Sequence, residues 1–509
     1  MKALAVISMS ALALLSTSAA RAQTSPGSRS RAAHFFSTPR WHQLNRAVQG
    51  VGAAALQAAN PTPIPNPTPN NRVTYHGGPV MQGYKAYTIF WAPAPHSIPS
   101  SYRALINRWF DDVGGSLLLN IAAQYFQFDP PSFPFATVQN DSSLGGTWLD
   151  TGNPYPDAGT AAAPLLDADI QAEVHRAIAA NAWPNGGNDV EYLVYTASGI
   201  ESCFSAAKTS CTPGVPGVSA NQQYLGYHSF VGSSPTIIYA NLPYAATWVD
   251  LGNFVSPNGV PDADLEIVVT SHEQFESITD PTLDAWSSDA DGEEIGDKCA
   301  GAFGAAAADG SNVTLNGNPY FVQGEWSNVQ AGCALGLLCS GQPKTGCRTP
   351  TRSHAASLQL KIAKTASKDT VTWKWNKGAA TAPTDFGDPL TATAYGLCVY
   401  DEAEGNPFLL MDVVAPAGSG WAQTATGFKY TNKTPIANEL QHVTLHAGAA
   451  GKATISVSGK GGGLPMPALP LEQGPKVIAQ FQNSAGMCWE ADYSSATKNS
   501  ATQFKAKSD

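Results

Sequence analysis

The stretch that decides the fold is Pro261-Asp-Ala-Asp-Leu-Glu-Ile-Val-Val-Thr-Ser-His-Glu-Gln-Phe-Glu-Ser-Ile-Thr-Asp280. Proline at the first position, followed by Asp262 and Asp264, is typical of a helix start. The helix should end before Pro281, because a proline disfavours helical geometry in the residue that precedes it. The expected inward face consists of Ile267, Val268, Ser271, Phe275 and Ile278.

Within this helix His272 and Glu276 are four residues apart, so both side chains project from the same face. An imidazole and a carboxylate are suitable ligands for a zinc ion. Glu273 holds the position of the general base in His-Glu-x-x-His metalloproteases. Here the second histidine is replaced by Glu276, which makes calcium or manganese more competitive. The alternative interpretation is an ordinary ion pair on a helix surface or a capped core histidine.

A metal site needs at least one more ligand, and an acidic run lies downstream at residues 289–299. We expect Glu294 to be the third ligand. Asp297 is the next candidate, either as a ligand or as an outer partner that orients His272. Asp280 is an auxiliary candidate at the end of the helix. The alternative is a solvated acidic loop or a weak calcium loop.

The sequence around this helix alternates between strand-like and helix-like patterns. Strands are expected at residues 87–91, 190–195 and 236–239, and helices at residues 101–114 and 163–182. This alternation predicts an α/β or α+β main domain over residues 73–333. A linker follows at residues 334–353, where glycine and proline recur.

Beyond the linker, residues 354–509 change to short strands with alternating polarity, separated by glycine and proline. The expected strands cover residues 358–362, 370–375, 397–400, 453–457 and 477–481. Such a pattern favours a β-sandwich-like module. Trp373, Trp375 and Trp489 could form a sugar-stacking surface, although aromatic residues in strands more often lie in the core.

The N-terminal residues indicate export. Residues 1–22 have a lysine, an apolar stretch and a small-residue cleavage motif, as in a signal peptide; a short membrane anchor is the alternative. Residues 23–72 form a proline-rich linker. No other stretch is long and apolar enough to span a membrane. We therefore expect a secreted, extracellular protein, with the periplasm as the alternative.

Charge and cysteine content bound the partners. The net charge is −10, which gives no general attraction for nucleic acid or anionic lipid. Eight cysteines in an exported chain favour disulfides, with a cysteine metal site as the rival. Sequence proximity suggests the pairs Cys203–Cys211, Cys299–Cys333, Cys339–Cys347 and Cys398–Cys488. Nucleotide and serine-hydrolase motifs were sought, and the sequence contains neither a phosphate-binding lysine loop nor a Gly-x-Ser-x-Gly elbow.

Several segments in order resemble the EXORDIUM/phosphate-induced protein family over residues 73–333. They include Val73–Met81 (Val-Thr-Tyr-His-Gly-Gly-Pro-Val-Met), Gly226-Tyr-His-Ser-Phe230, His272-Glu-Gln-Phe-Glu276, Glu294-Ile-Gly-Asp-Lys-Cys299 and Phe321-Val-Gln-Gly-Glu-Trp-Ser-Asn328. The resemblance implies a secreted protein in which His272, Glu276, Glu294 and Asp297 belong to the family motif. It does not cover the C-terminal module, which resembles accessory modules of exported bacterial proteins.

Together these features predict a zincin-like metal domain followed by a β-rich accessory domain. The first hypothesis is a metal-dependent hydrolase, most plausibly of peptide bonds, with peptide or cell-wall material as its partner. In it, a zinc ion is held by His272, Glu276 and Glu294, Glu273 is the base, and Tyr227 or His228 helps to polarise the carbonyl. The second hypothesis is a non-catalytic extracellular binding or signalling protein with a structural metal. A coordination position open to solvent would favour the enzyme, and a closed site the structural role.

Overall fold

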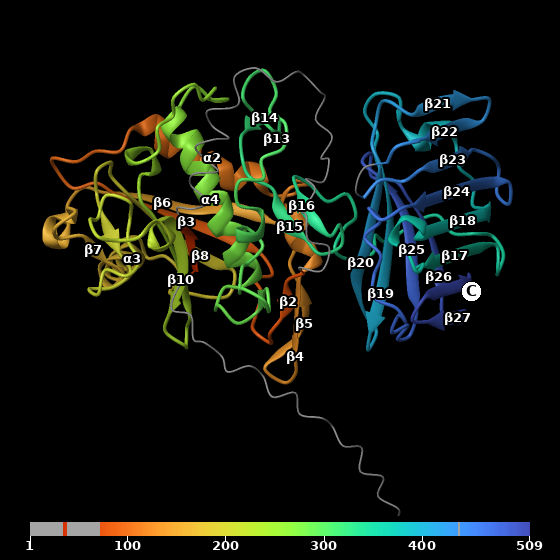
Figure 1. Ribbon diagram of the computed structural model, residues 1–509, viewed down its shortest axis with the longest axis horizontal. Helices are drawn as coiled ribbons and strands as arrows, with labels where there is room; N and C mark the ends of the chain where they lie inside the picture. Colours follow the sequence, from red (N-terminus) through yellow and green to blue (C-terminus); the bar gives the residue numbers. More distant parts are fainter. Residues whose placement is uncertain (1–33, 38–71, 436–437) are drawn as a thin grey trace, which may run out of the picture.

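The computed structural model describes residues 34–37, 72–435 and 438–509. The expected signal peptide and almost all of the proline-rich linker lie outside these ranges. The described chain is a mixed α+β protein with many strands, few helices and several sheets (Figure 1). No helix in the described ranges is long and apolar enough to cross a membrane.

A six-stranded mixed sheet forms the centre of the N-terminal part. Its order is β1-β10-β11-β8-β3-β6, in which β11, β8, β3 and β6 run parallel and β10 is antiparallel to both of its neighbours. The strands are β1 (His34–Ser37), β3 (Tyr84–Trp91), β6 (Ser142–Asp150), β8 (Val190–Thr196), β10 (Tyr224–Val231) and β11 (Ile237–Leu242). The sequence pattern predicted β3, β8 and β11 but missed β10.

Three α-helices accompany this sheet: α2 (Ser100–Val113), α3 (Asp167–Asn181) and α4 (Pro261–Thr279). The expected bounds of α4 are confirmed, with proline in the first turn and Asp280 as the C-cap. The five residues expected to face inward are buried, and burial extends to every residue from Ala263 to Thr279. One side of α4 packs on β10 and β11, and the segment around η5 (Asp297–Cys299) lies against another. A helix covered on several sides can be buried all round.

Short two-stranded sheets complete the N-terminal part. They pair β2 (Thr74–Tyr75) with β12 (Trp286–Ser287), β4 (Phe126–Asp129) with β5 (Phe133–Thr137), β7 (Leu165–Leu166) with β9 (Ser202–Cys203), β13 (Val313–Leu315) with β14 (Asn318–Tyr320), and β15 (Glu325–Ser327) with β16 (Gly332–Ala334). The β15–β16 pair matters for the site, since β15 contacts η5, whose Asp297 lies beside His272 of α4.

Two antiparallel sheets form the C-terminal part and share one hydrophobic core. The eight-stranded sheet contains, in order, β21 (Trp421–Thr424), β22 (Gly427–Thr431), β23 (His442–His446), β24 (Ala453–Lys460), β18 (Thr370–Gly378), β17 (Ala356–Lys361), β28 (Gln503–Lys507) and β27 (Ala496–Ser500). The second sheet contains β20 (Asn406–Ala415), β19 (Tyr395–Ala403), β25 (Val477–Asn483) and β26 (Cys488–Tyr493). Trp373, Trp375 and Trp489 lie in this core at 0% exposure, so they are not a sugar-stacking surface.

Four disulfides join the eight cysteines, which fits an extracellular protein. Cys203–Cys211 and Cys299–Cys333 form as predicted. The other two predicted pairs are wrong: Cys339 bonds Cys398, and Cys347 bonds Cys488. The segment that carries Cys339 and Cys347 runs along the four-stranded sheet. Cys339 therefore bonds a cysteine of β19 and Cys347 a cysteine of β26.

Candidate metal centre

Helix α4 brings the two predicted ligands together. The Nε2 atom of His272 lies 3.2 Å from Oε1 of Glu276, one turn along the helix. Both side chains are fully buried. The spacing alone was also compatible with an ordinary i,i+4 ion pair on a helix surface. Because both side chains are buried, that interpretation is excluded.

The third member of this group is Asp297, at the start of η5. Its Oδ1 lies 3.7 Å from His272 Nε2, and its backbone N–H donates a 2.9 Å hydrogen bond to Glu276 Oε1. One ligand atom from each of the three residues lies within 4.8 Å of the others. Gly296 permits this approach, because a Cβ there would lie 2.7 Å from His272 Nδ1. We call His272, Glu276 and Asp297 the first group.

A second group is centred on His228 of β10. Its Nδ1 lies 3.3 Å from Glu273 Oε2 and 3.7 Å from Glu276 Oε2. Ligand atoms of these three residues also lie within 4.8 Å of one another, and all three side chains are fully buried. We call His228, Glu273 and Glu276 the second group. Glu276 therefore belongs to both groups.

Glu294, the preferred third ligand, lies on the His228 side of the cluster. Its Oε1 is 3.8 Å from His228 Nε2, whereas Asp297 is the residue that joins His272. The sequence could not separate these two acids, since both precede Cys299 in one short turn-rich segment. Asp297, the second choice, is thus paired with His272, and Glu294, the first choice, with His228.

Two auxiliary candidates do not join either group. Tyr227 donates a 2.8 Å hydrogen bond to Asp167 on α3. Adjacent residues of a strand face opposite sides, so Tyr227 points away while His228 points toward α4. Asp280 caps α4 and accepts a 2.6 Å hydrogen bond from the backbone N–H of Ala285. Burial raises the pKa of Asp280 above its usual value.

Sequence reasoning missed two residues at the start of β15, Gln323 just before the strand and Glu325 as its first residue. The Gln323 amide contacts His272 Nδ1 and the carbonyl oxygen of Gly296, each at 2.9 Å. Glu325 is 1% exposed, and neither of its oxygens meets hydrogen-bond geometry with a partner in the described chain. Burial raises the pKa of Glu325 well above its usual value, the charges of Glu276 and Glu273 raise it further, and the Gln323 side chain offsets part of the rise. Both residues lie in the segment 321–328, which resembles the EXORDIUM/phosphate-induced protein family. That resemblance is the sequence signal that could have identified them.

The cluster combines donor types and charge that suit a divalent cation. Two imidazoles and five carboxylates converge, each at most 5% exposed: His228, His272, Glu273, Glu276, Glu294, Asp297 and Glu325. Burying one ion costs several kcal/mol unless it is compensated. Ion pairs with His228 and His272, at distances of 3.2 to 3.8 Å, join Glu273, Glu276, Glu294 and Asp297. Candidate ligand groups for a divalent cation are thus present.

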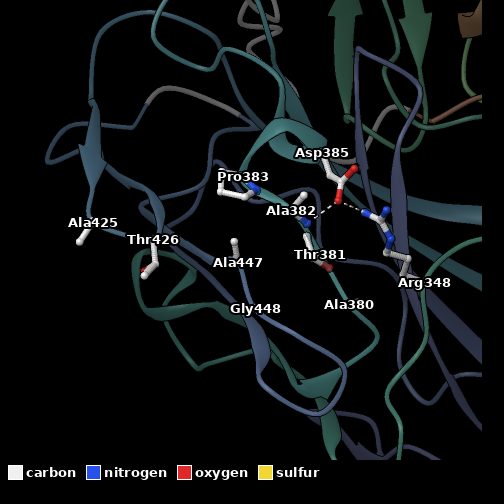
Figure 2. A pocket seen from close by; sticks show the side chains of 10 residues that line it. All are labelled: Arg348, Ala380, Thr381, Ala382, Pro383, Asp385, Ala425, Thr426, Ala447 and Gly448. Carbon is white, nitrogen blue, oxygen red and sulfur yellow. Dashed lines mark hydrogen bonds and ion pairs between the residues drawn. The ribbon is translucent and has the colours of Figure 1, made fainter.

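Two other features do not belong to this centre. Cys339, Cys398 and Asp412 also lie within ligand distance of one another, but both sulfurs are used in a disulfide. A cavity of about 680 Å³ lies in the C-terminal part, where Arg348 pairs with Asp385 at 2.8 Å beside Thr381 and Thr426 (Figure 2). It contains none of the cluster residues.

No family model and no curated protein matches this chain. Among solved structures, wild type OgpA from Akkermansia muciniphila aligns at 10% identity and a TM-score of 0.22, covering 83% of this chain and 95% of that one. Catalytic inactive OgpA in complex with an O-glycopeptide (glycodrosocin) substrate aligns at 9% identity and a TM-score of 0.20, with the same coverage. TM-scores this low do not show a common fold.

Proposed function

We propose that this chain is an exported, EXORDIUM-like, metal-dependent hydrolase of peptide bonds with a zincin-like centre on α4. The observation that carries the proposal is the surplus of ionisable groups around the first group. A closed structural zinc site needs four ligands. Here His228, Glu273, Glu294 and Glu325 surround His272, Glu276 and Asp297 as well. Clusters of buried titratable groups with interacting charges are typical of catalytic sites.

In this proposal the first group holds the ion, and zinc is favoured by the imidazole and carboxylate donors. A bound ion would supply Lewis acidity toward the scissile carbonyl and the attacking water. Glu273 would serve as the base that accepts a proton from water. His228, 3.3 Å from Glu273 Oε2, orients the acceptor and can donate to the carbonyl oxygen of the substrate. Tyr227 takes no part, because its hydroxyl is committed to Asp167.

The second candidate is a non-catalytic extracellular protein with a structural metal. One observation favours it: the side chains of both groups are at most 5% exposed. A closed site is the expected arrangement for a structural ion. The two candidates share the same first group, so metal content alone cannot separate them.

The deciding experiment is a peptide-library cleavage assay of folded protein loaded with one zinc ion per chain, repeated with one equivalent of manganese and of calcium. We expect cleavage by the wild type and its loss in Glu273→Gln, which changes charge with little change in shape. Glu472→Gln is the matched control, since Glu472 is an exposed glutamate in the C-terminal part. If metal-loaded wild-type protein cleaves no peptide, or if Glu273→Gln cleaves normally, the hydrolase proposal is wrong.

A further inference from the structure

The two oxygens of Glu276 face two different histidines. Oε1 lies 3.2 Å from His272 Nε2, and Oε2 lies 3.7 Å from His228 Nδ1. Each oxygen therefore belongs to a separate set of potential ligand atoms. A carboxylate in this position can bridge two divalent ions, which in known two-metal sites are roughly 3.5–4 Å apart.

A second ion would find donor atoms that the first group does not use. Glu273 Oε2 and Glu276 Oε2 lie 3.3 Å and 3.7 Å from His228 Nδ1, and Glu294 Oε1 lies 3.8 Å from His228 Nε2. Glu325 is an independent observation, because it is buried, lies close to Glu276 and Glu273, and has no hydrogen bond of normal geometry to either oxygen. Burial without hydrogen bonds is unfavourable for a carboxyl group. A cation bound nearby in the second group would compensate for this cost.

We propose that a second divalent cation of zinc type binds between His228, Glu273 and Oε2 of Glu276. It binds more weakly than the ion in the first group, for two reasons. The first ion repels it, and both ions share Glu276. The first group also has an outer partner in Gln323, which contacts His272 directly.

The second ion has a functional consequence that rests on the proposed hydrolase activity. Glu273 cannot accept a proton from water while its carboxylate is bound to a cation. The one-ion form is therefore the active form, and the two-ion form is inhibited. Excess zinc should switch off cleavage by occupying the second group, without unfolding the protein.

Zinc titration of metal-free protein, followed by calorimetry and elemental analysis after equilibrium dialysis, tests the proposal. We expect the wild type and Glu472→Gln to bind a tight and a weaker ion. His228→Ala and Glu273→Gln should keep the tight ion and weaken the second at least tenfold. Surface sites contribute equally to all four proteins, so the difference between variants measures the second group. If His228→Ala fails to fold, the nearly isosteric Glu273→Gln decides.

The outcomes separate this inference from the proposed function. Two binding steps in a protein that cleaves no peptide even at one zinc per chain would overturn the hydrolase proposal alone. A single binding step in active wild-type protein, or a second ion unaffected in Glu273→Gln, would overturn the second site alone. In active protein, cleavage should peak near one zinc per chain and fall as the second ion binds.

Discussion

The Nε2 atom of His272 lies 3.2 Å from Oε1 of Glu276, and both residues are on α4, the helix buried all round. A helix fixes this spacing more firmly than a loop could, so little rearrangement is needed before an ion binds. The remaining ligands come from β10 and from the segment that carries η5. Metal binding should therefore depend on how these two elements are held against α4.

The first prediction concerns the third ligand. Asp297→Asn should weaken the tight ion by about 10-fold or more, because a neutral amide replaces a carboxylate beside His272. Glu294→Gln is the matched variant and should leave the tight ion nearly unchanged, since Glu294 faces His228. Competition with a zinc-sensitive chelator dye measures both. The reverse result would make Glu294 the ligand, as the sequence first suggested.

The second prediction concerns Gln323. An ion on His272 Nε2 requires the ring proton on Nδ1, so the Gln323 amide must then present its oxygen to the ring. This requires the amide to flip, because its nitrogen contacts His272 Nδ1 and donates to the Gly296 carbonyl oxygen, each at 2.9 Å. Gln323→Leu removes the contact, and outer-shell losses of this kind usually cost about 10–100-fold in metal affinity.

The control for Gln323 is Gln330→Leu, a buried glutamine in the same segment that contacts Asp412 instead of the cluster. Both changes remove a buried amide, but only Gln323→Leu should weaken the tight ion in the chelator competition. Equal affinity for zinc in Gln323→Leu and wild-type protein would show that the ring is oriented by something else.

The sequence predicted α4, its bounds and its ligand pair, because helix signals and i,i+4 spacing are local. It missed β10, and with it the placement of His228 opposite Glu273. It also missed Glu325. This residue is 49 positions from Glu276 in the chain, yet the charge of Glu276 raises its pKa. These contacts depend on how the sheet and the η5 segment close around the helix, and no short-range pattern encodes that. The two wrong disulfides have the same cause.

The third prediction tests the revised disulfides. Peptide mapping without reduction should find Cys339 joined to Cys398 and Cys347 joined to Cys488. Replacing both Cys347 and Cys488 by alanine removes a bridge with a sequence separation of 141 and should cost about 2–5 kcal/mol. The Cys203–Cys211 pair, with a separation of 8, is the control and should cost less. Urea unfolding measures both losses, and a linked Cys339–Cys347 peptide would contradict the pairing.

The last prediction concerns Glu266, a fully buried carboxyl group on α4 that lies outside both ligand groups. Burial raises its pKa from 4.5 to about 8, although the hydrogen bond from the Ala245 N–H lowers it in part. A raised pKa in the folded state means that the neutral form is favoured by folding. The stabilisation is complete below about pH 4.5 and is lost as the pH rises through about 8.

Glu266→Gln should remove this dependence, because glutamine stays neutral and can still accept from the Ala245 N–H. Relative to wild type, the variant should gain stability between pH 5 and pH 9 by a few kcal/mol, since one pKa unit corresponds to about 1.4 kcal/mol. Urea unfolding of metal-free protein at both pH values measures the difference and keeps ion binding out of the comparison. Glu472→Gln, at an exposed position, should track wild type at both. A Glu266→Gln variant that loses stability in parallel with wild type across this range would show that Glu266 is already ionised in the folded protein.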